Sequence, residues 1–304
     1  MITTVSHDQV STQIDFSSLR GDLNVKDDPS RVPMALPKLY YKAGYKSLRI
    51  ARNSLLRKPV KRDSNFITSL YEKEWGKSNA QYAEIRDETR SIFRVGHGLV
   101  YTDGWFIIKR YKDLFLNAIN QIKAESVLEV GSGRGKNLAL LALNRPDLQL
   151  TGIELTHNGV DHSRRLAENL PPQFVRAAGY DAISEKQKAA IAQMKFSQGS
   201  ALQMPFKDKS FDFSFTCLVL EQLRRDYGQV AREMSRVTRK YCAFIEAFDE
   251  ANSWLGRANL HSYDYFNASY KEFANYGLEP VYFTTAMPHK LTFRTGLLIA
   301  RVVS

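Results

Sequence analysis

Cysteine and long apolar runs are scarce in this chain of 304 residues. Its two cysteines, Cys217 and Cys242, lie in apolar, strand-like runs. They are too few for a disulfide framework, and no Cys/His spacing matches a metal site. No apolar run reaches the about 20 residues of a bilayer-spanning helix, and the N-terminus lacks the basic-then-apolar order of a signal peptide. We therefore expect reduced, buried cysteines, no metal and a cytoplasmic protein.

Acidic residues are absent from residues 31–62, which carry ten basic residues. Because the net charge of the whole chain is +11, this stretch supplies almost all of it. Apolar residues recur there at helical intervals and share one face, namely Tyr41, Tyr45, Leu48, Ala51 and Leu55. Such a basic amphipathic helix can pack on its own domain, lie on the cytoplasmic face of an anionic membrane or grip a phosphate backbone. All three interpretations stay open.

The chain is organised around residues 126–137, where an apolar run ends in an acid and three alternating glycines follow. The apolar run predicts a buried parallel strand. Gly131, Gly133 and Gly135 let the backbone turn sharply against a ligand, and the amides of the next helix would face that ligand. A dinucleotide fingerprint has the different spacing G-x-G-x-x-G, and Glu129 would repel its pyrophosphate. The pattern therefore favours a nucleotide-like ligand with a positive amino group.

A second predicted strand, residues 149–154, ends in Glu154. A carboxylate about 20 residues after the glycine turn suits the two ribose hydroxyls of an adenosine group. Nicotinamide enzymes also place an acid at this position. Glu154 thus supports an adenosine ligand without choosing between cofactors.

The discriminating stretch is residues 198–215, which read QGSALQMPFKDKSFDFSF. Together with LEVGSGRG at 128–135, it resembles the class I S-adenosylmethionine-dependent methyltransferases of type 11, the small-molecule enzymes related to the ubiquinone C-methylase. Ser200 stands where the family has an Asp for the adenine amino group, and a hydroxyl can still accept a hydrogen bond. Residues 218–223 resemble the family's V-L-E-H run, with Gln222 in place of His.

The resemblance implies an α/β fold, a Rossmann-like sheet of seven strands with helices on both faces and an N-terminal helical lid. Its strands four and five are expected at 211–217 and 241–247, and antiparallel strands six and seven at 280–284 and 292–303. We expect a lead-in and basic extension at 1–62, a helical lid at 63–122 and the methyltransferase domain at 123–304, with an insertion at 170–194 near the cofactor edge. Within the lid, 78–95 and 105–122 are expected to be helical around a loop at 96–105, while the later segment 249–262 breaks helical periodicity.

The resemblance also implies S-adenosylmethionine as cofactor and S-adenosylhomocysteine as product. The residues expected to hold it are Glu129, Gly131, Ser132, Gly133, Gly135, Glu154, Leu155, Ser200, Ala201, Leu202, Cys217 and Leu218. Tyr101 and Trp105 join them as aromatic groups that would stabilise the sulfonium, although Trp105 equally suits a core anchor. Candidate bases are Glu221, Glu246 and Asp249, beyond the carboxyl ends of strands, and the loop residue His97; each also suits a solvated or capping role.

Methyl transfer from a sulfonium is an in-line displacement, and a base is needed only if the acceptor loses a proton during attack. After strand four the chain lacks the Asn/Asp-Pro-Pro-aromatic run of enzymes that methylate amino groups of nucleic-acid bases. We therefore expect O-methylation of a small-molecule, saccharide or lipid-linked acceptor, with residues 31–62 as the candidate contact to an anionic membrane. An RNA methyltransferase and a non-catalytic S-adenosylmethionine-binding partner subunit are the alternatives.

Overall fold

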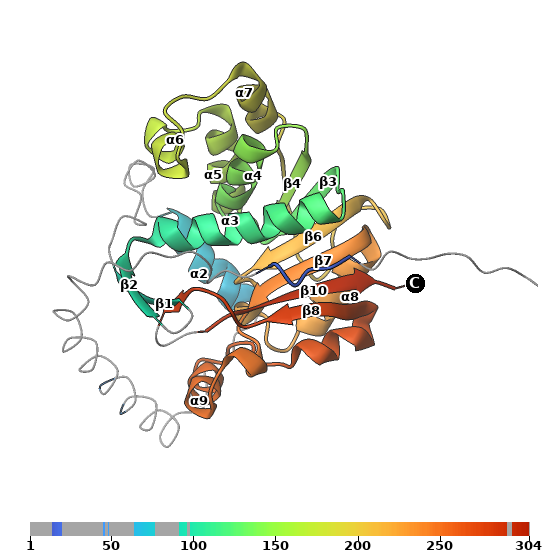
Figure 1. The fold of residues 1–304 in the computed structure, drawn as a ribbon. Helices are drawn as coiled ribbons and strands as arrows, with labels where there is room; N and C mark the ends of the chain where they lie inside the picture. The colour runs from blue at the N-terminus through green and yellow to red at the C-terminus, as the bar shows by residue number, and fades with distance from the viewer. Residues whose placement is uncertain are drawn as a thin grey trace, which may run out of the picture.

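The computed structural model describes residues 14–19, 45, 48, 64–76, 91–95, 98–290 and 294–303. Helices flank a seven-stranded sheet, and a smaller three-stranded sheet lies beside it (Figure 1). The elements are α2 (Ser64–Gly76), β1 (Ser91–Val95), β2 (Gly98–Thr102), α3 (Gly104–Gln121), β3 (Ser126–Val130), α4 (Lys136–Asn144), β4 (Gln149–Glu154), α5 (His157–Glu168), α6 (Pro172–Ala178), α7 (Glu185–Ala192), β5 (Lys195–Gln198), β6 (Phe211–Cys217), η3 (Leu220–Gln222), α8 (Tyr227–Val237), β7 (Thr238–Glu246), η4 (Asp249–Ala251), α9 (Trp254–Ser262), η5 (Tyr270–Tyr276), β8 (Leu278–Thr284), β9 (His289–Lys290) and β10 (Gly296–Val302).

The large sheet has the strand order β5-β4-β3-β6-β7-β10-β8. The first five strands are parallel, and β10 is antiparallel to both β7 and β8. This confirms the expected Rossmann-like seven-stranded fold. The expectation of two antiparallel strands is right only for β10, because β8 runs in the same direction as β7. The register of β8 shifts between Ile299 and Ala300, where Pro280 has no N–H to donate.

Both faces of the large sheet are buried, and β3 carries apolar side chains on both of them. Val127 of β3 points into a core shared with α3, α4 and α5. The neighbouring Leu128 and Val130 point to the opposite face and pack with α8 and η5. On the first face α5 begins after Thr156, whose hydroxyl accepts the amide of Gly159.

Residues 91–95, predicted as the end of a helix at 78–95, form a strand instead. Residues 98–102, predicted as part of a loop at 96–105, also form a strand. Strand β1 pairs with β2 as a hairpin, and β9, almost 200 residues away in sequence, completes the small sheet. Ile92, Phe93 and Val95 are buried, which suits β-branched and aromatic residues in a strand. Helix α3 then begins at Gly104, where Asp103 accepts the amide of Phe106. The local sequence could not reveal a partner as distant as β9.

Two further segments differ from expectation or add to it. Residues 254–262 form α9, although their sequence lacks helical periodicity, and Ser253 caps its start. The 170–194 segment contains α6 and α7, which pack on α3, α4 and α5 at one end of the sheet (Figure 1). The side chain of Gln187 donates to the carbonyl of Leu143, close to the C-terminus of α4.

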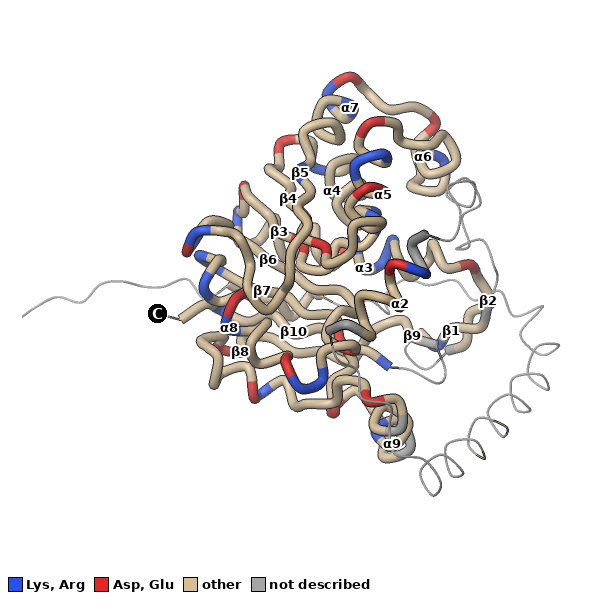
Figure 2. The backbone as a smooth tube through the Cα atoms, turned by 180° about the vertical axis from the view of Figure 1, so that it is seen from behind, with Lys and Arg blue, Asp and Glu red and all other residues tan. Residues whose placement is uncertain are grey.

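The basic stretch 31–62 lies outside the described residues, except for two positions. Tyr45 and Leu48 are helical and are 62% and 72% exposed. In the rest of the described chain, segments of basic and acidic residues alternate over the surface (Figure 2). None of the described helices combines the length and apolarity needed to span a membrane.

Candidate functional site

A cavity of about 570 Å³ opens beyond the carboxyl ends of β3, β4, β5 and β6, where ligands bind in such sheets. Two chemically different walls enclose it. The wall made by strand ends and their following turns consists of Glu129, Gly131, Ser132, Gly133, Arg134, Lys136, Asn137, Ile153, Glu154, Leu155, Thr156, Gly199, Ser200, Ala201 and Leu202. The wall made by α2, α3 and the turn after β6 consists of Ile67, Tyr71, Ile107, Ile108, Tyr111, Cys217, Leu218, Val219, Gln222 and Leu223.

The glycine turn after β3 is held against β4 and against the turn after β6. The amides of Gly131 and Ser132 both donate to the carbonyl of Ile153, at 2.8 and 3.0 Å. Gly131 has φ +73°, and a Cβ there would lie 2.5 Å from a methyl carbon of Val219. Only glycine fits both constraints. Gly135 does not line the cavity; it begins α4 with φ +74° and packs against Phe196.

Glu129 places a carboxylate with an open oxygen in the cavity wall. One oxygen accepts the side-chain amide of Asn137 at 2.7 Å. The other, Oε2, has no hydrogen-bond partner among the described residues, and the residue is 2% exposed. Burial raises the pKa of this carboxyl to about 8. A ligand ammonium group would satisfy both the open oxygen and the buried charge.

Two cations, Arg134 and Lys136, line the same wall as Glu129. A carboxyl group of the ligand could therefore bind beside its ammonium group. The combination of one buried acid and two bases on the glycine turn matches the zwitterionic end of an amino acid, and hence the methionine part of S-adenosylmethionine.

Glu154 lines the cavity, but its carboxylate also builds the turn around it. Its Oε2 accepts the amide of Gly133 at 3.0 Å. Its Oε1 accepts the amide and the hydroxyl of Thr156, at 3.1 and 2.7 Å. A carboxylate has about four acceptor positions, so capacity remains for a ribose hydroxyl.

Ser200, Ala201 and Leu202 continue this wall after β5, as the sequence predicts for the adenine end. The hydroxyl oxygen of Ser200 accepts the amide of Leu202 at 3.1 Å. This oxygen therefore shapes the turn. A second lone pair and the hydroxyl proton remain for a ligand.

A helical lid over the site was expected, but its individual wall residues from α2 and α3 were not named from the sequence. Ile107, Ile108 and Tyr111 are helical in the sequence pattern, but periodicity alone cannot distinguish a cavity wall from core packing. Cys217 is partly exposed rather than buried and lines the cavity, as predicted for a cofactor-binding residue. Its thiol pKa is raised well above the usual value, first by burial and then by nearby carboxylates such as Glu129. The thiol is therefore protonated and is a poor nucleophile.

Besides Gly135 and Glu246, five predicted site residues lie away from the cavity wall or outside the described chain. Tyr101 and Trp105 do not line it, and Trp105 is a buried anchor whose ring packs edge-on against Phe174 of α6. Among the candidate bases, Glu221 and Asp249 do not line it. His97 falls outside the described residues.

Glu246, the third candidate base after β7, is fully buried behind the cavity wall. It accepts the amide of Val219 at 2.9 Å, and burial raises its pKa to about 8. Leu218, next to Val219, has φ +59°, a strained value for a residue other than glycine. Glu246 thus stabilises the strained turn at Leu218 and Val219, and this turn packs against Gly131.

The comparisons with known proteins agree with this geometry. Residues 128–245 match the family model described as "Methyltransferase domain". A 132-residue stretch is 29% identical to an uncharacterized 37.1 kDa protein in transposon TN4556 of Streptomyces fradiae, covering 43% of this chain and 32% of that protein. The matched stretch thus spans about a third of the curated relative's length.

Two solved structures share the fold at low sequence identity. A geranyl diphosphate methyltransferase in complex with GPP and sinefungin is 14% identical with a TM-score of 0.50, covering 77% of this chain and 98% of that one. The [4+2]-cyclase SpnF is also 14% identical with a TM-score of 0.53, covering 81% of this chain and 98% of that one. At this identity the likeness concerns the fold alone, and one fold can host different reactions.

The family match runs through the glycine turn, β4 and the 198–215 segment into β7. The cavity also offers an open buried carboxylate where an ammonium group is expected. Residues 128–245 therefore form a methyltransferase domain with the class I fold, whose cofactor is S-adenosylmethionine.

Proposed function

We propose that this chain transfers the methyl group of S-adenosylmethionine to a small, largely apolar acceptor bound against α2 and α3. The observation that carries the proposal is the continuity of the two walls. The open carboxylate oxygen of Glu129 and the aliphatic side chains of Ile107 and Ile108 face one cavity. A ligand whose ammonium group binds Glu129 would thus share its chamber with an apolar molecule.

The lining favours some of the expected acceptor classes over others. Ile67, Ile107, Ile108 and Leu223 offer no hydrogen bonds, whereas a free saccharide needs many. The proposal therefore places a lipid-linked or otherwise apolar molecule ahead of a free saccharide. We further propose a hydroxyl oxygen as the methylated atom: its bond to the methyl carbon would form as the carbon–sulfur bond breaks, S-adenosylhomocysteine would leave, and the hydroxyl proton would pass to water. Tyr71 and Gln222 offer hydrogen-bonding side chains to this hydroxyl in the helical wall.

The chain's contribution to the reaction would be positioning. The cofactor supplies an electrophilic methyl group, and the two walls would hold acceptor and cofactor in line, an effect worth about 7–11 kcal/mol. The hydroxyl of Tyr111 forms a hydrogen bond with Thr295 at 3.1 Å, and burial raises its pKa. Tyr111 and Cys217 therefore stay protonated at neutral pH and do not serve as bases.

The test is transfer of radiolabelled methyl from S-adenosylmethionine into a fractionated extract of the source cell, followed by NMR of the labelled product. Label in the organic-solvent fraction, as an O-methyl group, supports the proposal. Label in RNA would instead favour an RNA methyltransferase. Binding of S-adenosylhomocysteine in calorimetry, with no label in any fraction, would favour a non-catalytic partner subunit.

A membrane contact through residues 31–62 is a further part of the proposal, because its only described apolar side chains, Tyr45 and Leu48, are exposed. These side chains would enter the lipid interface while the basic residues bind anionic headgroups. Co-sedimentation with anionic vesicles should weaken when residues 1–62 are removed. Unchanged co-sedimentation would discard this contact.

A further inference from the structure

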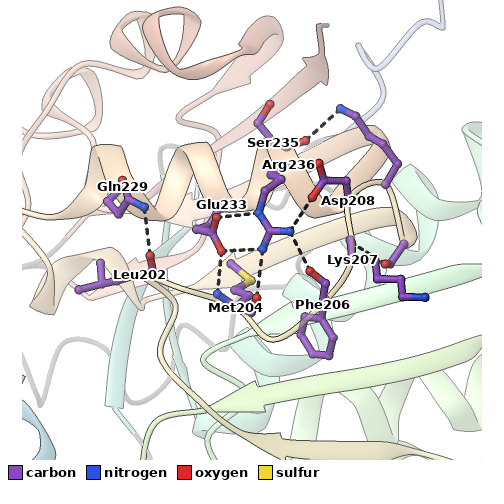
Figure 3. A network of polar contacts seen from close by, with 11 residues as sticks. Leu202, Met204, Phe206, Lys207, Asp208, Gln229, Glu233, Ser235 and Arg236 are labelled. Carbon is purple, nitrogen blue, oxygen red and sulfur yellow. Dashed lines mark hydrogen bonds and ion pairs between the residues drawn. The ribbon is translucent and has the colours of Figure 1, made fainter.

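One face of α8 carries a stripe of polar side chains, Gln229, Glu233 and Arg236, at intervals of four and three residues. This spacing places them side by side along the helix. The stripe faces the loop between β5 and β6, as Figure 3 shows. None of the three lines the cavity.

Arg236 binds three residues of the loop that lie two positions apart in the sequence. Its guanidinium donates to the carbonyl of Met204 at 3.0 Å, to the carbonyl of Phe206 at 2.8 Å and to the carboxylate of Asp208 at 2.8 Å (Figure 3). Glu233 holds the guanidinium with two 2.8 Å bonds. The planar fork of arginine can satisfy these acceptors together, whereas a lysine ammonium has a different geometry.

The other two members of the stripe act on the same loop. The carboxylate of Glu233 accepts the amide of Met204 at 2.7 Å. The side chain of Gln229 donates to the carbonyl of Leu202 at 3.1 Å. Both backbone groups of Met204 are thereby fixed to α8, and its side chain is 3% exposed.

This loop continues directly from the cavity wall. Gly199, Ser200, Ala201 and Leu202 line the cavity, at the end where the adenine ring is expected. Ser200 replaces the family's carboxylate, so less of the base recognition can come from that side chain. The position of the backbone at 200–202 then matters more, and it is set two residues later by the bonds to Met204.

We propose that Arg236, seated by Glu233, is a positioning residue for the cofactor: it fixes the 200–208 loop so that its first residues form a wall selective for adenine. The proposal rests on the proposed function, since it assumes that the cavity binds S-adenosylmethionine. It goes beyond that function by assigning base selectivity to a residue outside the cavity.

The chain offers a matched control in Arg239. Its guanidinium also holds this loop, through the carbonyl of Lys209 at 3.0 Å, together with Asp212 at 3.1 Å and Ser126 at 3.2 Å. These contacts lie at the amino ends of β3 and β6, opposite the cavity. Arg239→Met therefore removes an arginine with one bond to the far end of this loop and two bonds to β3 and β6, without touching the cavity-lining end of the loop.

The experiment measures the affinity of S-adenosylhomocysteine and of S-inosylhomocysteine, which differ only in the base, by calorimetry on the full chain. For Arg236→Met we expect S-adenosylhomocysteine to bind on the order of tenfold more weakly, with a smaller preference for adenine over hypoxanthine. For Arg239→Met we expect affinity within about twofold of the native chain and an unchanged preference. Arg236→Lys should restore little, because it keeps the charge and loses the fork.

Gln229→Met is the milder variant should Arg236→Met fail to fold, since it removes one bond to Leu202. It should shift the base preference in the same direction. Native preference in every folded variant of the stripe overturns the proposal, as does an equal loss in Arg239→Met. A native chain that binds neither nucleoside overturns the proposed function itself, a result visible before any variant is made.

Discussion

The two walls of the cavity are built in different ways. The cofactor wall consists of strand ends and turns that the sheet fixes to one another, with backbone amides and acids in set positions. Half of the residues in the opposite wall are from α2 and α3, which precede the matched methyltransferase region, and the other half belong to residues 217–223. Backbone geometry thus defines the cofactor wall, whereas side-chain identity defines the acceptor wall. Substitutions in the cofactor wall should therefore change cofactor binding, and substitutions in the acceptor wall should change reaction with the acceptor.

The largest effect is expected for Gly131→Ala, where the backbone itself is disturbed. The substitution combines φ +73° with a Cβ 2.5 Å from Val219, a residue of the opposite wall. We expect a loss of about 2–4 kcal/mol in the free energy of unfolding, from the left-handed conformation and overpacking. Binding of S-adenosylhomocysteine should be lost with it. Urea unfolding and calorimetry measure the two effects.

Gly179→Ala is the control for this substitution. Gly179 has φ +98° at the end of α6, and nothing lies within 4 Å of its added Cβ. Only conformational strain remains, about 1–2 kcal/mol, and cofactor affinity should not change. If the Gly131→Ala and Gly179→Ala variants bound the cofactor equally well, the close packing of the glycine turn against the turn after β6 would not determine cofactor binding.

Glu129→Gln should weaken cofactor binding and stabilise the fold. The variant loses the charged partner of the ligand ammonium, an effect of about 1.5–3 kcal/mol in binding. In the folded chain the carboxyl has a pKa of about 8, raised from 4.5 by burial. Between these values the unfolded chain is ionised while the folded chain holds its proton, so native stability falls as pH rises from about 4.5 to 8 and stays low above.

The variant lacks this titration, so its stability advantage should appear above pH 4.5 and grow to about 2–4 kcal/mol near pH 8. Unfolding curves across this pH range measure it, with the exposed Glu185→Gln as control. Binding to the native chain should also release protons below pH 8, because an ammonium partner favours the ionised carboxylate. Equal pH profiles for native and variant chains would show that Glu129 titrates normally.

Ile108→Ala should affect the acceptor and leave the cofactor alone. The side chain is apolar and lines the helical wall. Loss of apolar contact should lower kcat/KM for the acceptor by about 1–3 kcal/mol in transition-state free energy, with unchanged affinity for S-adenosylhomocysteine. Leu116→Ala is the control, because Leu116 lies half-buried on the same helix away from the cavity. A matching loss of cofactor affinity in Ile108→Ala would contradict the separation of the walls.

The same separation explains how much the sequence could predict. The glycine turn and the acids at two strand ends are local patterns, whereas the large sheet and the other expected cofactor residues came from the family resemblance. Eleven of the twelve expected residues line the cavity, and their contact with the cofactor stays a prediction. Gly135 is the exception. Its spacing is typical of the glycine turn, but it lies against Phe196 and not in the cavity wall.

The rest depends on contacts distant in sequence. Strand β1 pairs along its whole length with β2 and at Phe93 and Arg94 with the distant β9. The aromatic pair Tyr101 and Trp105 shows the same limit. A tryptophan before a helix suits a cofactor contact and a core anchor equally, and only the position of Phe174, in the 170–194 segment, places Trp105 in the core.

The smallest effect is expected for Glu221→Gln, the leading base candidate in the sequence. Glu221 lies outside the cavity wall, and its side chain accepts a 3.0 Å hydrogen bond from the side chain of Gln222, which does line the cavity. An amide oxygen can accept the same bond, so turnover should stay within about threefold of the native rate, as for a substitution away from the chemistry. Single-turnover rates across pH 6–9 give the measurement. A large loss of rate together with the loss of one pH inflection would return Glu221 to the role of base, and would mean that the acceptor wall extends beyond the cavity as the structure has it.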